Sequence, residues 1–184
     1  MYSKGLYVYD TQTDKLTILT MSDRGKKGYL CNDWVRSLYY DGHGRLWIAT
    51  SNGVCNMNTS TLSFNDLGWT KILPDILSNA ICADRHGNIV IGTDNGLYIY
   101  NVKTLKTGLL PGSDMLRDKQ VSAMTTDRQG NIWISTTMGI WQYNAARKQF
   151  YSYINGNGLT SHEYMLGSMM RDADDRIAFG TADG

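Results

Sequence analysis

The sequence predicts an all-β protein in which one antiparallel unit recurs along the chain. A motif that opens with Asp, turns at Gly (Asp in the last copy) and closes an apolar run with Thr occurs four times: DGHGRLWIATSNGV, DRHGNIVIGTDNGL, DRQGNIWISTTMGI and DADDRIAFGTADG. The opening Asp residues, at positions 41, 84, 127 and 172, lie 43, 43 and 45 residues apart. The 19 glycines, 12 tyrosines and two prolines suit short strands joined by tight turns. Because such a repeat determines the architecture, the strands are predicted from the repeating unit.

Each copy divides into four short strands. The first strand ends at the opening Asp and is predicted at residues 35–41, 80–84, 121–127 and 166–172. The second follows the turn, at residues 46–50, 89–93, 132–136 and 177–181. The third begins after an Asn-Gly-like turn, at residues 6–10, 54–58, 97–101 and 140–144. The fourth is shorter and more polar, at residues 15–19, 61–65, 104–108 and 148–153.

Polarity rises from the inner to the outer strands of each copy. The second strand is apolar at nearly every position, as a strand covered on both faces is, whereas the third alternates more clearly. Antiparallel four-stranded units of about 40 to 50 residues, with no helical periodicity, predict a β-propeller. We expect residues 1–184 to form a fragment of about four blades, namely a half blade, three whole blades and another half blade, in the segments 1–20, 35–67, 78–108, 121–153 and 164–184.

The glycines of the motif have a backbone reason. Gly44, Gly87 and Gly130 follow the opening Asp by three residues, where the turn requires a positive φ and the Asp side chain caps its own turn. The last copy carries Asp175 at this place, a residue that tolerates a positive φ less well. We call the equivalent positions of the copies a repeat column, and we therefore interpret these glycine columns as structural.

Composition narrows the classes of function. A charged fraction of 19% and a net charge of +1 offer no electrostatic case for nucleic acid or an anionic membrane. No apolar run approaches the roughly 18 residues of a membrane-spanning helix, and the N-terminus MYSKGLYVYD does not resemble a signal peptide. Cys31, Cys55 and Cys82 share no metal-like spacing, and an odd number argues against a disulfide framework.

The histidines and acidic clusters favour structural interpretations. His43 and His86 occupy one repeat column inside the Asp-to-Gly turn, where the other copies have Gln129 and Asp174, so the column is a surface turn and not a ligand set. The stretch DADD at 172–175 lacks the Gly and the distal Glu of a calcium loop. The sequence predicts no metal site and no cofactor.

With these columns aligned, the motif D-x-x-G-x-[IL]-W-[IV]-[GAS]-T-x-x-G-[LIV] resembles the two-component regulator propeller repeat. That repeat builds the periplasmic sensor region of hybrid two-component sensor histidine kinases in glycan-degrading gut bacteria. The stretch NGLTSHEYMLGSMMRDADDRIAFGTADG is similar to the terminal blade of that family, although Thr160, His162 and Tyr164 stand where Pro, Asn and Phe are usual. The chain thus looks like the C-terminal blades of a sensor propeller cut from its parent.

The resemblance implies a non-catalytic, periplasmic segment that senses a glycan or oligosaccharide for signal transduction. The chain has none of the kinase domains of such a parent, so we expect no enzyme activity from it. Two alternatives are a propeller lyase-like enzyme, which would need His or Glu residues gathered at the ring centre, and a protein-interaction scaffold. The sequence does not identify the ligand.

Candidate ligand-binding residues lie in the connections between blades, outside the repeat columns. Such loops are where scaffolds place ligand sites, and aromatic groups with carboxylates and amides suit sugars. These candidates are Trp69, Lys71, Asp75, Asn79, Asp114, Arg117, Lys119, His162, Glu163 and Tyr164.

The two half blades predict a homodimer that closes the propeller. The chain starts with the third and fourth strands of a blade and stops after the first and second, leaving apolar faces and strand edges to be covered. Closure within one chain gives a four-bladed ring with about 90° between blades, whereas two chains give eight blades at about 45°. In a seven-bladed propeller, neighbouring blades meet at about 51°. Blades of that shape would need much less repacking to form an eight-bladed ring than a four-bladed one.

Overall fold

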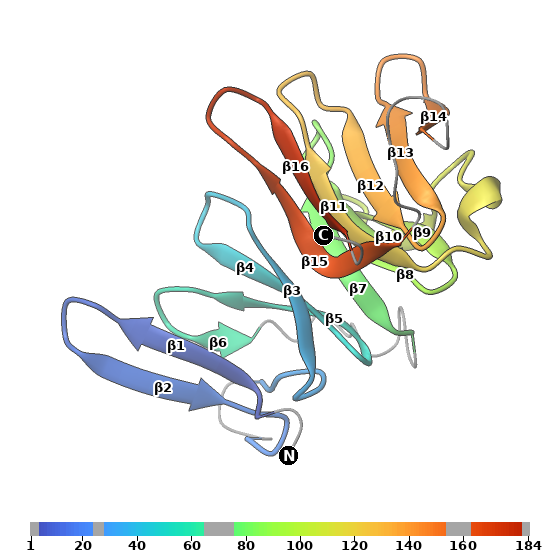
Figure 1. Ribbon diagram of the computed structural model, residues 1–184. Helices are drawn as coiled ribbons and strands as arrows, with labels where there is room; N and C mark the ends of the chain where they lie inside the picture. Colours follow the sequence, from blue (N-terminus) through green and yellow to red (C-terminus); the bar gives the residue numbers. More distant parts are fainter. Residues whose placement is uncertain (1–3, 24–27, 65–75, 154–162, 182–184) are drawn as a thin grey trace. The chain divides into compact units, whose positions relative to one another are not determined.

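The computed structural model describes residues 4–23, 28–64, 76–153 and 163–181. The chain separates into two compact units, residues 1–78 and 79–184, and each unit is described by itself. The described residues are almost entirely β (Figure 1). Among them the only helix is η2, a single 3₁₀ turn over Asp114–Leu116, so the predicted all-β class is confirmed.

The first unit contains one two-stranded and one four-stranded antiparallel sheet. Strands β1 (Leu6–Asp10) and β2 (Lys15–Leu19) form the first sheet. The second sheet has the order β3-β4-β5-β6, with β3 at Val35–Tyr40, β4 at Arg45–Thr50, β5 at Gly53–Asn58 and β6 at Ser63–Phe64.

The second unit contains two four-stranded sheets and one two-stranded sheet, with β7 beginning at its boundary. The sheet β7 to β10 comprises β7 (Ser78–Ala83), β8 (Ile89–Thr93), β9 (Gly96–Asn101) and β10 (Lys106–Leu109). The next comprises β11 (Val121–Thr126), β12 (Ile132–Thr136), β13 (Gly139–Asn144) and β14 (Gln149–Tyr153). The last pairs β15 (Tyr164–Arg171) with β16 (Ile177–Thr181).

These sheets are the predicted half blade, three blades and half blade, in chain order. The register repeats as well, because the Thr that closes the second strand lies opposite the Gly that opens the third. This pair is Thr50 and Gly53 in one blade, Thr93 and Gly96 in the next, and Thr136 and Gly139 in the third. A propeller fragment is therefore the observed fold.

The motif turns have the geometry that the sequence predicts. Gly44, Gly87 and Gly130 adopt φ values of 86°, 78° and 81°, and Asp175 adopts 69°. In the second blade, the Asp84 carboxylate accepts hydrogen bonds from the backbone N–H groups of His86 and Asn88, both at 2.8 Å. The Asp side chain thus caps its own turn.

The fourth strands begin later than predicted in all three complete blades. The strands predicted from residues 61, 104 and 148 begin at Ser63, Lys106 and Gln149. The reason is a residue with positive φ in each preceding turn, namely Leu62 at 53°, Leu105 at 57° and Lys148 at 54°. Because a left-handed residue cannot continue a strand, the strand begins after it.

The core of the second unit lies between its sheets. Buried side chains of β8 and β9, including Val90 and Leu97, share one cluster with Ile132 and Ile134 of β12. The sheets approach so closely that a Cβ added at Gly92 would lie 2.4 Å from a side-chain carbon of Val121. Glycine is therefore required here by space.

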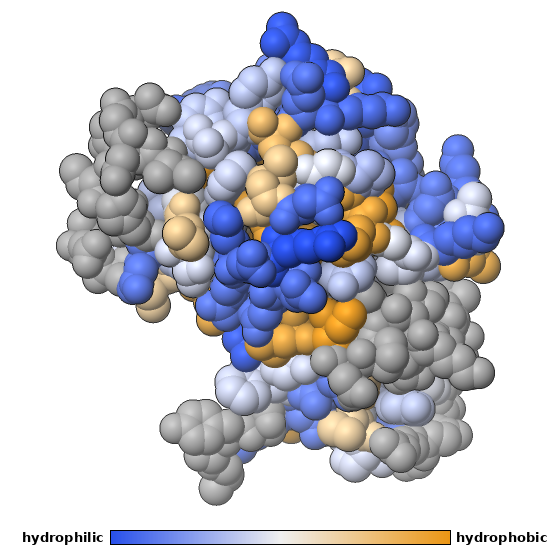
Figure 2. Space-filling view, turned by 90° about the vertical axis from the view of Figure 1, so that its right-hand side faces the viewer, coloured by the Kyte–Doolittle hydropathy of each residue, from blue (hydrophilic) through white to orange (hydrophobic). Residues whose placement is uncertain are grey.

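Burial falls from inner to outer strands, as predicted from polarity. In the second blade every residue of β7 and β8 is buried, whereas β10 has no buried residue. The half blade β15–β16 differs, because most of β15 is exposed although it is a first strand. Figure 2 shows one face of the molecule, on which separate hydrophobic patches lie among hydrophilic residues.

Candidate functional site

A hydrogen-bonded cluster in the second unit joins the start of β7, the β8–β9 turn and the residue before β11. The Asp94 carboxylate oxygen Oδ1 accepts from Asn79 Nδ2 at 2.7 Å and from Gln120 Nε2 at 3.0 Å. Asn79 is 1% exposed, and its own carbonyl oxygen Oδ1 is buried without a hydrogen-bond partner. The cluster therefore holds an acceptor atom that a small polar group could satisfy.

Local turn chemistry positions Asp94. The Thr93 hydroxyl donates to the Gly96 carbonyl at 2.9 Å and accepts from the Asn95 N–H at 3.0 Å, which closes the turn around Asp94. Gly96 supplies the positive φ of 91° that this turn requires. The Asp94 side chain is thus held at the end of the blade where β8 turns into β9.

The same two repeat columns form a side-chain bond in the first unit. Arg36 occupies the column of Asn79, and Ser51 occupies the column of Asp94. Arg36 Nε donates to Ser51 Oγ at 3.3 Å. In each of these two blades, a polar residue of the first strand therefore bonds to a residue in the turn between the second and third strands.

Three predicted candidates gather around the 3₁₀ turn η2. Arg117 and Asp114 form an ion pair of 2.9 Å, with side chains 53% and 75% exposed, so it adds little stability. Lys119 Nζ donates to the Met115 carbonyl at 2.8 Å and lies 5.8 Å from the centre of the Trp141 ring. These contacts lie in the connection that leads to Gln120 of the cluster.

The remaining candidates do not join this cluster among the described residues. Glu163 is exposed, and Tyr164 is buried with its ring packed edge-on against Phe179 at 6.1 Å between ring centres. Burial raises the pKa of Tyr164. The predicted candidates Trp69, Lys71, Asp75 and His162 lie outside the described residues.

Sequence reasoning missed Asp94 and Gln120. Asp94 was assigned to a repeat turn, although its column holds Ser51 and Thr137 in neighbouring blades. A carboxylate in a column of hydroxyl residues is the signal that could have identified it. Gln120 carried no such signal, because its part in the cluster depends on the packing of two blades.

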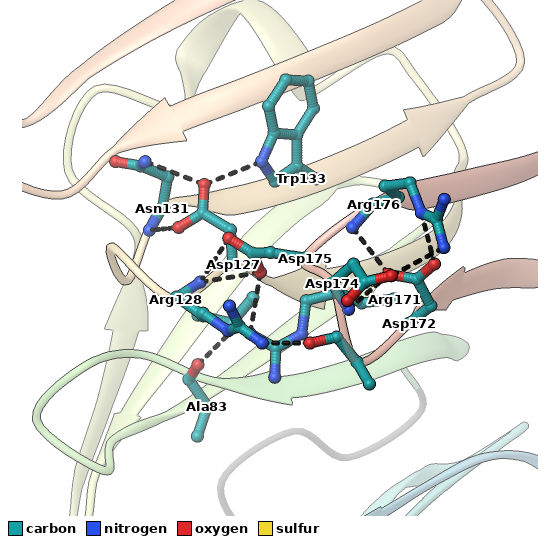
Figure 3. A network of polar contacts seen from close by, with 12 residues as sticks. Ala83, Asp127, Arg128, Asn131, Trp133, Arg171, Asp172, Asp174, Asp175 and Arg176 are labelled. Atoms are coloured by element: carbon teal, nitrogen blue, oxygen red, sulfur yellow. Dashed lines mark hydrogen bonds and ion pairs between the residues drawn. The ribbon is translucent and has the colours of Figure 1, made fainter.

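A second polar network lies at the opposite ends of these strands, around the motif turns (Figure 3). Asp127 accepts from the Asn131 N–H at 2.8 Å, Asn131 Nδ2 at 2.9 Å and Trp133 Nε1 at 3.0 Å. Asp175 accepts from the Arg128 N–H at 3.1 Å and pairs with Arg171 at 3.2 Å. These bonds tie a turn to itself, to its flanking strands or to the adjacent turn, so we interpret the network as structural.

The titratable groups of the described ranges were compared with metal sites and with reactive thiols. No group of three His, Cys, Asp or Glu residues there could hold a metal ion. The buried thiol of Cys82 has its pKa raised to about 12, mainly by desolvation. The pKa of Cys31 is also raised, chiefly by its hydrogen bond with Cys55 and by burial. Such thiols are poor nucleophiles at neutral pH.

No helix in the part of the chain that the structure describes has the length and hydrophobicity to cross a bilayer.

Two segments of the chain match a known family. Residues 29–52 and 115–138 match the model of the two component regulator propeller. Each match runs from the approach to a first strand through the motif turn to the end of the second strand. No curated protein matches the chain.

Solved structures with the same fold include two sensor domains and one lyase. The extracellular domain of the one component system BT4673 from B. thetaiotaomicron is 21% identical, with a TM-score of 0.78, over 97% of this chain and 24% of that chain. The extracellular domain of the hybrid two component system BT3049 from the same organism is 24% identical, with a TM-score of 0.73, over 96% and 24%. Virginiamycin B lyase from Staphylococcus aureus is 14% identical, with a TM-score of 0.65, over 97% and 57%.

At these identities the similarities establish the fold alone. The chain spans about a quarter of the length of the sensor domains that it matches.

Proposed function

Since the chain carries repeats of the two component regulator propeller, we propose that it is a ligand-sensing propeller segment of a hybrid two-component sensor. Its role is to bind an oligosaccharide and to contribute to signal transduction, without catalysis. The extracellular sensor domains among the similar structures support this assignment and a periplasmic location. The observation that carries ligand binding is the cluster of Asn79, Asp94 and Gln120.

The chemistry of the cluster favours a neutral polyhydroxyl ligand. Asp94 supplies a carboxylate with a second oxygen beyond the one that the two amides bind, and carboxylates accept strong hydrogen bonds from hydroxyl groups. Asn79 Oδ1 is a further acceptor that is buried and unpartnered. A sugar hydroxyl can donate to the second oxygen of the exposed Asp94 carboxylate, whereas the buried Asn79 carbonyl is costly while it has no partner.

The same cluster favours binding over catalysis. General acid–base chemistry requires a positioned side chain that gains and loses a proton, and the amide side chains of Asn79 and Gln120 do not titrate. The lyase among the similar structures shares the fold, and fold alone does not carry a reaction. We therefore place the lyase alternative second and the interaction scaffold third.

We also propose that two copies of the chain assemble as a homodimer that closes the propeller. The exposed apolar side chains of both half blades support this assembly. In the dimer the connections of both copies would surround one ligand face.

Thermal shift followed by calorimetry tests the ligand site. A panel of neutral oligosaccharides should contain at least one that raises the Tm of the 184-residue chain. Asp94→Asn should weaken its binding by about tenfold or more, because one charge-assisted hydrogen bond is worth about 1.5–3 kcal/mol.

The matched control is Asp118→Asn, which removes a carboxylate from the neighbouring connection but not from the cluster. It should leave the affinity unchanged. Equal losses from both substitutions, or the absence of any binding oligosaccharide, would contradict the proposed site. Cleavage of the bound ligand, followed by mass spectrometry, would contradict the non-catalytic role.

A further inference from the structure

The hairpin of β1 and β2 exposes one apolar face. Along its strands the alternate residues Tyr7, Tyr9, Leu16 and Ile18 are between 48% and 55% exposed. The register places Tyr7 opposite Ile18 and Tyr9 opposite Leu16, so all four lie on the same face. The opposite face packs into the core of the first unit, where Leu6 is buried. This face is therefore an ordered apolar surface on a strand pair with a free edge among the described residues.

The complete blade β11–β14 shows what such a face does when it is covered. Trp141 and Tyr143 of β13 occupy the columns of Tyr7 and Tyr9, and Phe150 of β14 occupies the column of Leu16. All three belong to the cluster that packs against Val90, Leu97 and Ile99 of the preceding blade. The exposed face of the β1–β2 hairpin thus has the residue types of an inter-blade contact.

A complementary groove lies on the other side of the same complete blade. Side chains of β12, β13 and β16 line a cavity of about 450 Å³, among them Trp133, Gln142, Ile177 and Phe179. Trp133 stacks on Tyr153 at 5.5 Å between ring centres and lies 6.5 Å from Phe179. Trp133 and Gln142 occupy the columns of Val90 and Ile99, which the next blade covers. The groove is therefore an inter-blade face whose outer part is open.

Strand β16 also offers the edge at which a third strand would pair. In the three complete blades the second strand lies between the first and the third, whereas β16 is paired with β15 alone among the described residues. An open strand edge beside an apolar groove is a template for another strand.

We propose that the β1–β2 hairpin of a second copy completes the sheet of β15 and β16, with β1 antiparallel to β16. This junction rests on the proposed assembly of two copies. The register of β12 and β13 then places Val8 opposite Ala178 and Tyr7 opposite Phe179. Tyr7, Tyr9 and Leu16 enter the groove beside Trp133 and Gln142. A two-fold axis repeats the junction, so both free edges are covered at once.

The conformation of Gly5 supports this junction. Gly5 has a φ of 83°, close to the 78°, 91° and 106° of Gly53, Gly96 and Gly139. Those three glycines open a third strand opposite the Thr that closes a second strand. Gly5 therefore already has the geometry of a strand-opening glycine, and Thr181 of the second copy is the residue that it would face.

Light scattering and designed disulfides test the junction. At micromolar concentration the chain should have twice the mass of 20.7 kDa. Tyr7→Asp combined with Ile18→Asp should reduce the mass to that of one chain, since both side chains are exposed in the single copy. Met138→Asp, which also changes an exposed apolar residue, should leave the dimer intact.

The register is tested by Val8→Cys combined with Ala178→Cys. Directly opposite residues have Cβ atoms about 4.5–5.5 Å apart, so oxidation should link two chains covalently. The control pair Val8→Cys with Arg176→Cys is shifted by two residues, to about 7–8 Å, and should link poorly. Val8→Cys alone measures the background from Cys31, Cys55 and Cys82, which are free thiols.

The outcomes separate the junction from the assembly and from ligand sensing. If the wild-type chain is a monomer, or if the disulfide forms within one chain, the hairpin that completes the sheet of β15 and β16 does not come from a second copy. A dimer in which the shifted pair links as well as the aligned pair overturns this register while two-copy assembly stands. Neither result depends on whether an oligosaccharide binds near Asp94.

Discussion

The complete blade β11–β14 and the half blade β15–β16 carry the same motif but differ in how deeply it is buried. Ile132 and Ile177 occupy the same column, yet Ile132 is 0% exposed and Ile177 is only half-buried. Four of the six residues of β11 are buried, whereas β15 exposes Met165, Leu166 and Met170. The motif therefore makes the same strands in both places without making the same core.

The difference shows that burial in this fold comes from neighbours on both faces of a sheet. The complete blade has the sheet β7–β10 on one face and the half blade on the other. It also has its own outer strands, β13 and β14, which shield the inner pair. The half blade has one covered face and no outer strands among the described residues, so its apolar side chains stay near solvent.

Matched Ile-to-Ala substitutions should give the largest difference between the two regions. Ile132→Ala should lower the free energy of unfolding by about 3 kcal/mol, because it removes a fully buried side chain. Ile177→Ala should cost about 1 kcal/mol, since part of that side chain already contacts water. Urea denaturation at a concentration that keeps the chain monomeric measures both. Equal costs would mean that the half blade is as well packed as the complete one.

Substitution of the motif Asp should give a smaller difference. Asp127→Ala leaves Trp133 Nε1 and two groups of Asn131 without their acceptor in a nearly buried site, which should cost about 2 kcal/mol. Asp172→Ala should cost less, because its partners on Asp174 and Arg176 are exposed to water. Thermal unfolding of the two variants provides the comparison. A larger loss at Asp172 would contradict it.

Acid should weaken the turn of the half blade only at low pH. The pKa of Asp172 is lowered, first by the hydrogen bond from the Arg176 backbone N–H and next by the Arg176 side chain. Its contribution to stability is therefore complete above the unfolded pKa of about 3.9 and is lost as the pH falls through the lower folded value. The amide signals of Asp174 and Arg176 in NMR spectra should move in that range.

A substitution sharpens this test by making the half blade resemble the complete one. Asn131 stands in the complete blade where Arg176 stands in the half blade. Arg176→Asn should therefore raise the pKa of Asp172 toward its ordinary value. An unchanged titration would mean that the backbone bonds alone lower it.

The fold could be predicted from the sequence because a blade is built from local rules repeated in register. Most strand boundaries agreed to within a residue, but two first strands begin two residues earlier than predicted, at Ser78 and Tyr164, and residues with positive φ such as Leu62 delayed fourth strands. Nothing in the type of residue at position 62 marks that conformation, because leucine rarely adopts it. The loop candidates were harder, since residues outside the columns have no repeat to align them.

The candidate cluster also contains one residue that the sequence could predict and two that it could not. Asn79 could be predicted because it stands at a connection between blades and is polar in a buried strand. Its partner Asp94 is 15 residues away and is brought to it by the pairing of β7 with β8 in one sheet, whereas Gln120 is 26 residues from Asp94 and reaches it from the connection to the next blade. Residues of the connections lie outside the repeat columns, so the members of such a cluster do not share a motif.

By itself, the sequence determined the strands, their turns and their order, because each follows from interactions within a few residues: Asp172 capping its own turn, or Thr136 binding across to Gly139. Only the tertiary structure decided which of these strands became a core and which apolar faces stayed open. The physical reason is that burial depends on what lies against a sheet face, and that neighbour comes from another blade. Ile132 and Ile177 have the same identity and the same place in the motif, and their surroundings alone separate them.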